Sequence, residues 1–143
     1  MRVKLIILLV ALSVAVGGCG FNFKQSAEQP APAPSTYADD LIKVSQPALD
    51  AKIASPLVVK GEARGTWFFE ASFPIKLIDD RGALLAQGIA QAQSDWMTEE
   101  FVPFEARLEF SAPTVATGQL ILSKDNPSGL PANDRQIVIP VNF

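Results

Sequence analysis

Apolar and polar residues alternate with a period of two along much of the chain after residue 50. In residues 69–77 the apolar positions are Phe69, Ala71, Phe73, Ile75 and Leu77. Such alternation is typical of a β-strand with one buried face, because successive side chains of a strand point to opposite sides. The turn-forming residues 79–82 then allow residues 83–93 to return as the second strand of a hairpin.

The same alternation predicts strands at residues 57–63, 104–110, 119–123 and 136–143, with a short one near residues 50–54. Helical periodicity is weak, and residues 97–101 are expected to form no more than one helical turn. Six or seven short strands with polar turns indicate an all-β fold, an antiparallel β-sandwich. Pro74 and Pro140 lack a backbone N–H and are expected on edge strands or at bulges.

Residues 1–18 have the pattern of a secretory signal peptide, with Arg2 and Lys4 before an apolar run that ends at Val16. The run is shorter than the roughly 20 apolar residues that a membrane-spanning helix needs. The stretch Val16-Gly17-Gly18-Cys19 resembles the lipobox of bacterial lipoproteins. This resemblance implies cleavage before Cys19 and a diacylglycerol, usually with a further fatty acid such as palmitate, on that residue. An ordinary signal peptide followed by an incidental cysteine is the alternative.

Residues 19–40 are polar and proline-rich, with Pro30, Pro32 and Pro34 alternating with alanine. Alternating proline favours an extended conformation, so this segment is expected to tether a folded domain at residues 41–143 to the lipid. The anchor is expected in the cell membrane, or in the outer membrane facing the periplasm if the cell has one.

The charge and composition of the chain limit the functions that it can have. After residues 1–18 are removed, ten Lys and Arg face fifteen Asp and Glu, and an acidic chain lacks the basic surface that nucleic-acid binding needs. The sequence has no histidine, and its single cysteine is the predicted lipid site. Histidine-based catalysis and histidine metal sites are therefore excluded, and no cofactor or metal is expected.

Residues 59–75, which read VKGEARGTWFFEASFPI, carry a family resemblance together with residues 79–82, 95–99 and 124–130. They resemble the immunoglobulin-like domain found beside germination modules in bacterial spore-germination proteins, and the likeness extends over residues 45–143. The resemblance implies an immunoglobulin-like sandwich of about seven strands. Immunoglobulin-like folds serve many functions, so it does not by itself imply a role in germination.

Aromatic residues supply two candidates for a contact surface. On a continuous strand, Trp67 and Phe69 would face the core while Phe68 faces solvent, which makes Phe68 a candidate contact residue. Trp96 and Met97, in an acidic loop, are further candidates, although they could equally cover one end of the sandwich.

Two loops combine polar groups. Residues 95–100 could supply calcium ligands together with Asp125, Asn126 or Asp134, but solvated turn acids are favoured because the spacing of a calcium loop is absent. Residues 124–131 are rich in turn formers, and this loop is the preferred interaction site, through Asp125, Asn126, Pro127 and Ser128.

These features favour a non-catalytic, membrane-tethered lipoprotein of the envelope that binds another envelope protein. The alternative is a module that binds cell-wall polysaccharide through Trp96 or Phe68. An enzyme using a carboxylate pair such as Glu62 and Asp95 is disfavoured, because nothing in the sequence brings the two groups together.

Overall fold

The computed structural model describes residues 36–143, which fall within one compact unit. The predicted signal peptide, Cys19 and the tether as far as residue 35 lie outside the described residues. Within residues 36–143, no helix combines the length and the apolar composition that a membrane crossing requires.

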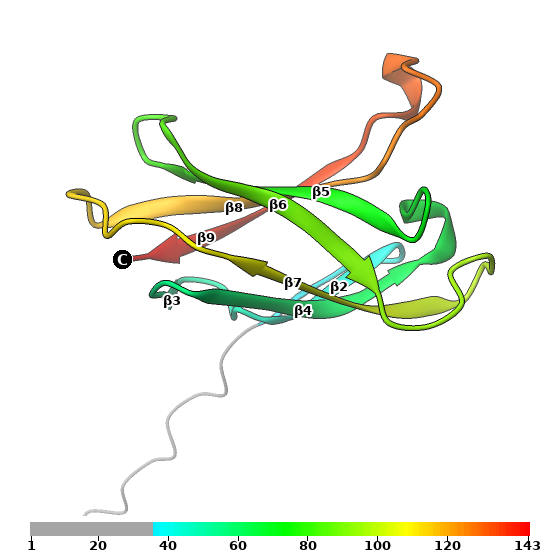
Figure 1. Ribbon diagram of the computed structural model, residues 1–143, viewed down its shortest axis with the longest axis horizontal. Coiled ribbons are helices and arrows are strands. Elements are labelled where there is room, and N and C mark those ends of the chain that lie inside the picture. The colour runs from blue at the N-terminus through cyan, green and yellow to red at the C-terminus, as the bar shows by residue number, and fades with distance from the viewer. Residues whose placement is uncertain (1–35) are drawn as a thin grey trace, which may run out of the picture. The chain divides into compact units, whose positions relative to one another are not determined.

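The described part of the chain forms nine strands and two short 3₁₀ helices (Figure 1). The elements are β1 (Tyr37–Ala38), β2 (Ile42–Gln46), β3 (Ala51–Lys52), β4 (Leu57–Arg64), η1 (Gly65–Trp67), β5 (Ser72–Asp79), β6 (Leu84–Ala92), β7 (Phe101–Leu108), β8 (Thr117–Ser123), η2 (Pro131–Asn133) and β9 (Gln136–Asn142). The strands predicted from the alternating pattern are all present. β1 and β2 were not predicted, so the folded part begins before the expected Leu41.

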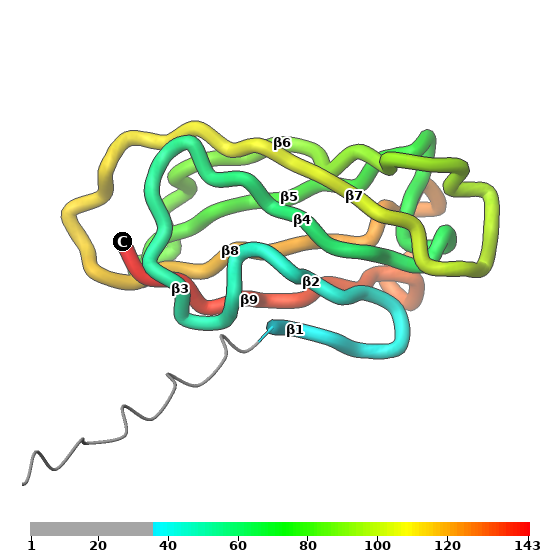
Figure 2. The backbone as a smooth tube through the Cα atoms, turned by 90° about the horizontal axis from the view of Figure 1, so that it is seen from below, coloured from blue at the N-terminus to red at the C-terminus, as the bar shows by residue number. Residues whose placement is uncertain are grey.

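The strands form one curled sheet in the order β1-β2-β4-β7-β6-β5-β8-β9-β3. Its two halves face each other as two layers, with β4 and β7 in one layer and β5, β6 and β8 in the other (Figures 1 and 2). The layers are joined where β6 meets β7, through only two residue pairs, Gln91 with Glu105 and Ala92 with Phe104. The predicted sandwich is therefore confirmed.

The N-terminal part of the domain contributes to both layers. β2 pairs antiparallel with β4, whereas β3, a few residues later, pairs in parallel with β9. The chain thus crosses between layers at the turn that follows Gln46. The Gln46–Pro47 and Ser55–Pro56 peptide bonds on either side of β3 are cis.

The core lies between the layers and is filled by alternate residues of the facing strands. Phe73 is at the centre of an aromatic cluster, with ring centroids 5.0 Å from Phe104, 5.2 Å from Phe68 and 6.1 Å from Trp67. All three pairs meet edge to face, the arrangement that aromatic rings prefer.

The prediction is right for Trp67 but wrong for Phe68 and Phe69. The chain forms η1 and then a tight turn at Phe69–Ser72 before β5 begins, so the alternation of a strand does not apply there. Phe68 is buried, with 4% of its surface exposed, whereas Phe69 is 41% exposed. Trp67 is buried in the core, as expected.

The two prolines differ in position. Pro74 lies in β5, an interior strand between β6 and β8, contrary to expectation. It is tolerated because the β5–β8 pairing begins only at Ile75. Pro140 lies in β9 just before the short pairing with β3 begins at Val141, and on that side its carbonyl accepts the amide of Asp50 at 2.9 Å. Residues 97–100 form bends rather than a helical turn, and β7 begins at Phe101.

Candidate binding site at the loop end

Three loops lie together at one end of the sandwich: residues 65–71, 93–100 and 124–135. We call this the loop end. Strand register places them together, because Arg64 pairs with Phe101, Ser72 with Gln91, and Ser123 with Gln136. In Figure 1 these loops lie on the right, and the C-terminus lies at the opposite end.

Hydrogen bonds connect the bases of the three loops. The amide of Gly65 donates to the carbonyl of Glu100 at 3.2 Å, and the amide of Asp125 donates to the carbonyl of Trp67 at 3.0 Å. The side chain of Arg64 donates to the carbonyl of Glu99 at 3.2 Å. Loop 65–71 is therefore bonded to each of the other two loops.

Gly65 makes the closest approach between two loops. A Cβ at this position would overlap the backbone carbonyl oxygens of Thr98 and Trp96. Only glycine allows the two loops to pack at this distance, so Gly65 sets the geometry of the loop end.

The loop at residues 124–135 is ordered by its own side chains. The amide nitrogen of Asn126 donates to the carbonyl of Leu130 at 2.9 Å and to the carboxylate of Asp134 at 2.7 Å. Ser128 donates to the side-chain oxygen of Asn126, and Asn133 donates to Ser128 at 3.0 Å. The network holds the projecting loop in one conformation. An apolar side chain at the tip of this loop therefore stays in solvent instead of folding back onto the domain.

Each loop exposes one large apolar side chain. Phe69 is 41% exposed in the first loop, Met97 76% in the second and Leu130 60% in the third. An exposed apolar residue alone needs no explanation, whereas exposed apolar surface that is contiguous marks contact sites. Three such side chains on bonded loops make this end of the sandwich the candidate contact surface. The sequence analysis did not predict Phe69 and Leu130 as contact residues. Leu130 lies between two turn-forming residues, Gly129 and Pro131, and this position could have indicated that its side chain is exposed.

The exposure of Phe69 depends on a strained turn. Phe69 and Ser72 exchange backbone hydrogen bonds at 3.0 and 3.1 Å, and the two residues between them, Glu70 and Ala71, have φ values of 50° and 62°. Left-handed dihedrals at both central positions favour Asn and Gly, and other residues adopt them at a cost of order 1 kcal/mol each.

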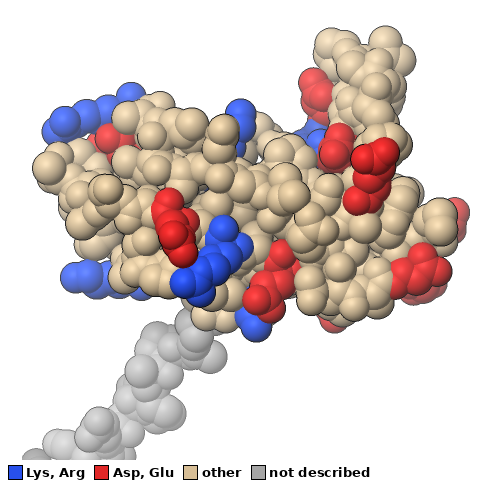
Figure 3. All heavy atoms as spheres, in the orientation of Figure 1, with Lys and Arg blue, Asp and Glu red and all other residues tan. Residues whose placement is uncertain are grey.

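The loop end is acidic. Its three loops contain six acidic residues against two basic ones, Lys124 and Arg135. Figure 3, which shows one face, has most of its visible acidic side chains toward the loop end, whereas basic side chains lie at the opposite end and across the middle.

Asp39 connects the β1–β2 turn to the loop end. Its carboxylate accepts the amides of Leu41 at 2.8 Å and Ile42 at 2.7 Å, and it lies 3.3 Å from the guanidinium of Arg135. Partial burial alone would raise the pKa of Asp39, but these bonds and one from the Tyr37 hydroxyl outweigh it and lower the pKa. The pKa of Tyr37 is raised, first by burial and then by Asp39.

The structure brings together most of the predicted contact residues. Met97, Pro127 and Ser128 are exposed at the loop end, and Asp125 and Asn126 are partly buried because they hold the loops in place. Trp96 is partly buried and packs against the core. Phe68 is the exception: it belongs to the core and cannot serve as a contact surface.

The acidic groups considered for calcium or catalysis are not assembled. Within residues 36–143, no three acidic or cysteine side chains are grouped so that they could hold a metal ion. The carboxylate of Asp95 accepts the amide of Met97. Glu62 lies on the outer face of β4, where it pairs with Lys43 at 3.8 Å, so it does not form a pair with Asp95.

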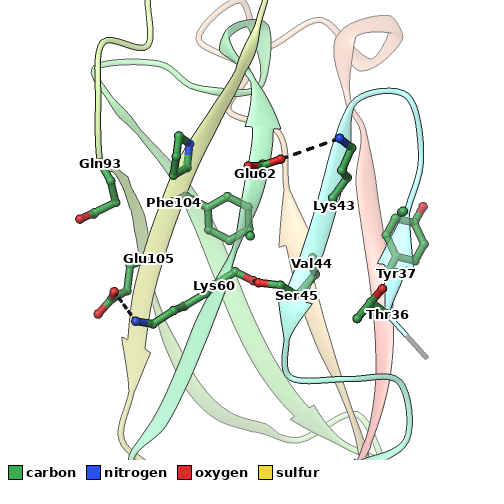
Figure 4. A pocket seen from close by; sticks show the side chains of 13 residues that line it. Thr36, Tyr37, Lys43, Val44, Ser45, Lys60, Glu62, Gln93, Phe104 and Glu105 are labelled. Atoms are coloured by element: carbon green, nitrogen blue, oxygen red, sulfur yellow. Dashed lines mark hydrogen bonds and ion pairs between the residues drawn. The ribbon is translucent and has the colours of Figure 1, made fainter. Parts of the chain in front are cut away.

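A shallow hollow of about 500 Å³ lies on the outer face of β2, β4 and β7 (Figure 4). Its charged side chains neutralise one another: Lys43 pairs with Glu62, and Lys60 with Glu105 at 3.0 Å. All four side chains are about half exposed, so the hollow presents no uncompensated charge to a ligand. The loop end is the better candidate.

Comparison with known proteins gave one match. A family model described as the immunoglobulin-like domain of bacterial spore germination matches residues 41–129. No curated protein and no solved structure matches the chain.

Proposed function

Because the chain belongs to the family of the immunoglobulin-like domain of bacterial spore germination, we propose that this immunoglobulin-like sandwich is a non-catalytic binding domain of a lipid-anchored envelope protein. Its loop end would contact a protein partner. One observation carries the proposal: three connected loops present Phe69, Met97 and Leu130 at the same end of the sandwich.

The direction of the chain supports this assignment. Tyr37 pairs with Val44 and Ala38 with Lys43, so the chain runs toward the loop end as it joins the sheet. The first described strand therefore points its C-terminal end, not its N-terminal end, at the loops.

The charge and the exposed apolar side chains of the loop end support a particular kind of protein partner. An acidic surface with apolar tips complements a protein surface that carries Lys or Arg around apolar residues. Because the charges are exposed, added salt is expected to weaken binding.

The direct test is photocrosslinking in cells. A photoreactive amino acid at Met97 or Leu130 should give a crosslinked adduct whose partner is identified by mass spectrometry. The same amino acid at Arg81, exposed at the opposite end, is the matched control. No adduct from the loop end, or equal adducts from Arg81, would count against the proposal.

The lipid anchor is tested separately. Cys19→Ala should abolish both fatty-acid labelling and recovery with membranes, since two or more acyl chains are needed for stable anchoring. Gly20→Ala, which keeps the sulfur, should retain both. Membrane recovery of Cys19→Ala would show that another feature holds the chain there.

A cell-wall polysaccharide is the alternative partner, favoured only by the partial exposure of Trp96 next to Met97. Retention on purified peptidoglycan that Trp96→Ala removes, with no protein adduct in the crosslinking experiment, would replace the protein partner with a polysaccharide.

A further inference from the structure

The two layers of the sandwich differ in the charge on their outer faces. In β2, β4 and β7 every charged side chain makes an ion pair: Lys43 with Glu62, Lys60 with Glu105, Arg64 with Glu100, and Arg107 with Glu109. In the layer of β5, β6, β8 and β9 (Figure 1), only Lys76 and Asp79 are charged. The carboxylate of Asp79 accepts amides of the turn after β5. Lys76 is therefore the one charged side chain on the outer face of this layer.

Apolar side chains surround Lys76 on that face. Strand register places Ile121 beside Lys76, Val138 beside Ile121, and Ile89 beside Pro74. Ile89 is 56% exposed and Val138 is 40% exposed. Neighbours across a strand pair lie about 5 Å apart on one face, so these side chains are contiguous. We call this surface the outer apolar face, formed around Lys76 by Pro74, Ile78, Ile89, Ile121 and Val138.

The lone cation restricts what can cover this face. Contiguous exposed apolar surface marks contact sites, and within residues 36–143 Lys76 makes no ion pair. A purely apolar covering would take an unpaired ammonium group out of water, which is costly. Two such faces packed against each other would bury both lysines without a carboxylate. The covering surface therefore has carboxylates among its apolar side chains.

The loop end of this chain has that composition. It exposes Phe69, Met97 and Leu130, and its three loops contain Glu70, Asp95, Glu99, Glu100, Asp125 and Asp134. We propose that the loop end of one copy binds the outer apolar face of a second copy, with the ammonium group of Lys76 facing the carboxylates of the loops. The inference rests on the proposed function and names the partner of the same site.

The contact joins two different surfaces of the chain. A pair of copies therefore keeps one free loop end and one free outer apolar face, and further copies can add to it. The chain has a formal net charge of −3, so copies repel each other in most orientations. Placing Lys76 against the acidic loops is the orientation in which opposite charges meet, which fixes how the copies approach.

The first experiment is sedimentation velocity over a range of concentrations, on the chain from Gly20 to Phe143, which contains the whole compact unit. The wild type should associate beyond a dimer as its concentration rises. Lys76→Glu places a carboxylate against the acidic loops and should raise the dissociation constant at least about tenfold. Lys60→Glu makes the same charge change on the outer face of the other layer and should change it less than about twofold. Thermal unfolding confirms that both variants fold.

A mixing experiment tests whether the two surfaces bind each other. Met97→Ser with Leu130→Ser removes the apolar tips of the loop end but keeps the outer apolar face, whereas Lys76→Glu keeps the loop end. Each variant alone should associate weakly. A mixture of the two should form a dimer about as tightly as the wild type associates, and it should stop at the dimer because only one intact contact is available.

Three results would overturn the proposal: a wild type that stays monomeric, equal weakening by Lys76→Glu and Lys60→Glu, or a mixture in which the two variants do not bind each other. If the protein stays monomeric and photocrosslinking from Met97 identifies a different protein, this inference fails and the proposed function stands. A crosslink in cells from Met97 to the outer apolar face of a second copy would support both.

Discussion

Two tight turns lead into and out of β5, and they use different residues at opposite ends of the sandwich. The turn at Asp79–Gly82 has glycine at its left-handed position, with φ 83°, and the Asp79 carboxylate accepts the amides of Arg81 and Ala83. The turn at Phe69–Ser72 instead places Glu70 and Ala71 at φ 50° and 62°.

The difference lies in how well the turn residues match their backbone. The residues of Asp79–Gly82 suit their dihedrals, whereas the turn at Phe69–Ser72 holds two residues that do not, beside the exposed Phe69. Asp50, at the opposite end, also has a left-handed φ of 55°, which aspartate tolerates better than most residues. Backbone strain held in place by its surroundings is a feature of functional sites. The comparison therefore agrees with a binding role for the loop end, and it can be tested by exchanging the residues that differ.

Gly65→Ala should have the largest effect. The added methyl group overlaps the carbonyls of Thr98 and Trp96, so the loops must separate, at an expected cost of about 3 kcal/mol or more in unfolding free energy. Urea unfolding measures this cost. Gly82→Ala, where nothing lies within 4 Å of the added Cβ, should cost only about 1 kcal/mol from its dihedral. Equal losses would mean that contact between the loops is unimportant.

Asp39→Ala should be next, at about 2 kcal/mol near neutral pH, because two backbone amides and Arg135 lose their acceptor. Since folding lowers the pKa of Asp39, its contribution is complete above the unfolded value of 3.8 and is lost as the pH falls through the lower folded value. Urea unfolding of the variant and the wild type should therefore differ at neutral pH and converge in acid. Asp39→Asn keeps an acceptor oxygen and should lose less. A cost that does not change with pH would exclude the charge as its cause.

Replacing Glu70 with Asn and Ala71 with Gly should stabilise the domain by about 1 kcal/mol, because both new residues suit left-handed dihedrals. Thermal unfolding measures the gain. The sign is opposite to that of Gly82→Ala at the other turn, and a destabilised double variant would show that the turn is not strained.

Met97→Ser with Leu130→Ser should have the smallest effect on stability, within about 0.5 kcal/mol, because both side chains are largely in solvent. The same double variant should lose the partner adduct when the photoreactive amino acid is placed at nearby Pro127. A large loss of stability would place these side chains in the fold rather than at a contact.

The sequence predicts the body of the domain well, because a period of two is a local property of each strand. It fails at Phe68 and Phe69, where the same apolar pattern continues but the chain forms η1 and a tight turn. Pro74 shows a similar limit. An edge position is the usual place for proline, but only the tertiary structure shows that the β5–β8 pairing begins at Ile75, one residue after Pro74.

The sequence by itself determined the all-β class and the positions of most strands and turns; the lipid on Cys19 stays a prediction. These follow from residue types and their spacing along the chain. Only the tertiary structure decided that Phe68 is buried and Phe69 exposed, that three distant loops are bonded together at one end, and that β6 and β7 pair over only two residues. Each of these depends on which strands pair and where the pairing stops, and contacts between residues far apart in the chain leave no periodic pattern in the sequence.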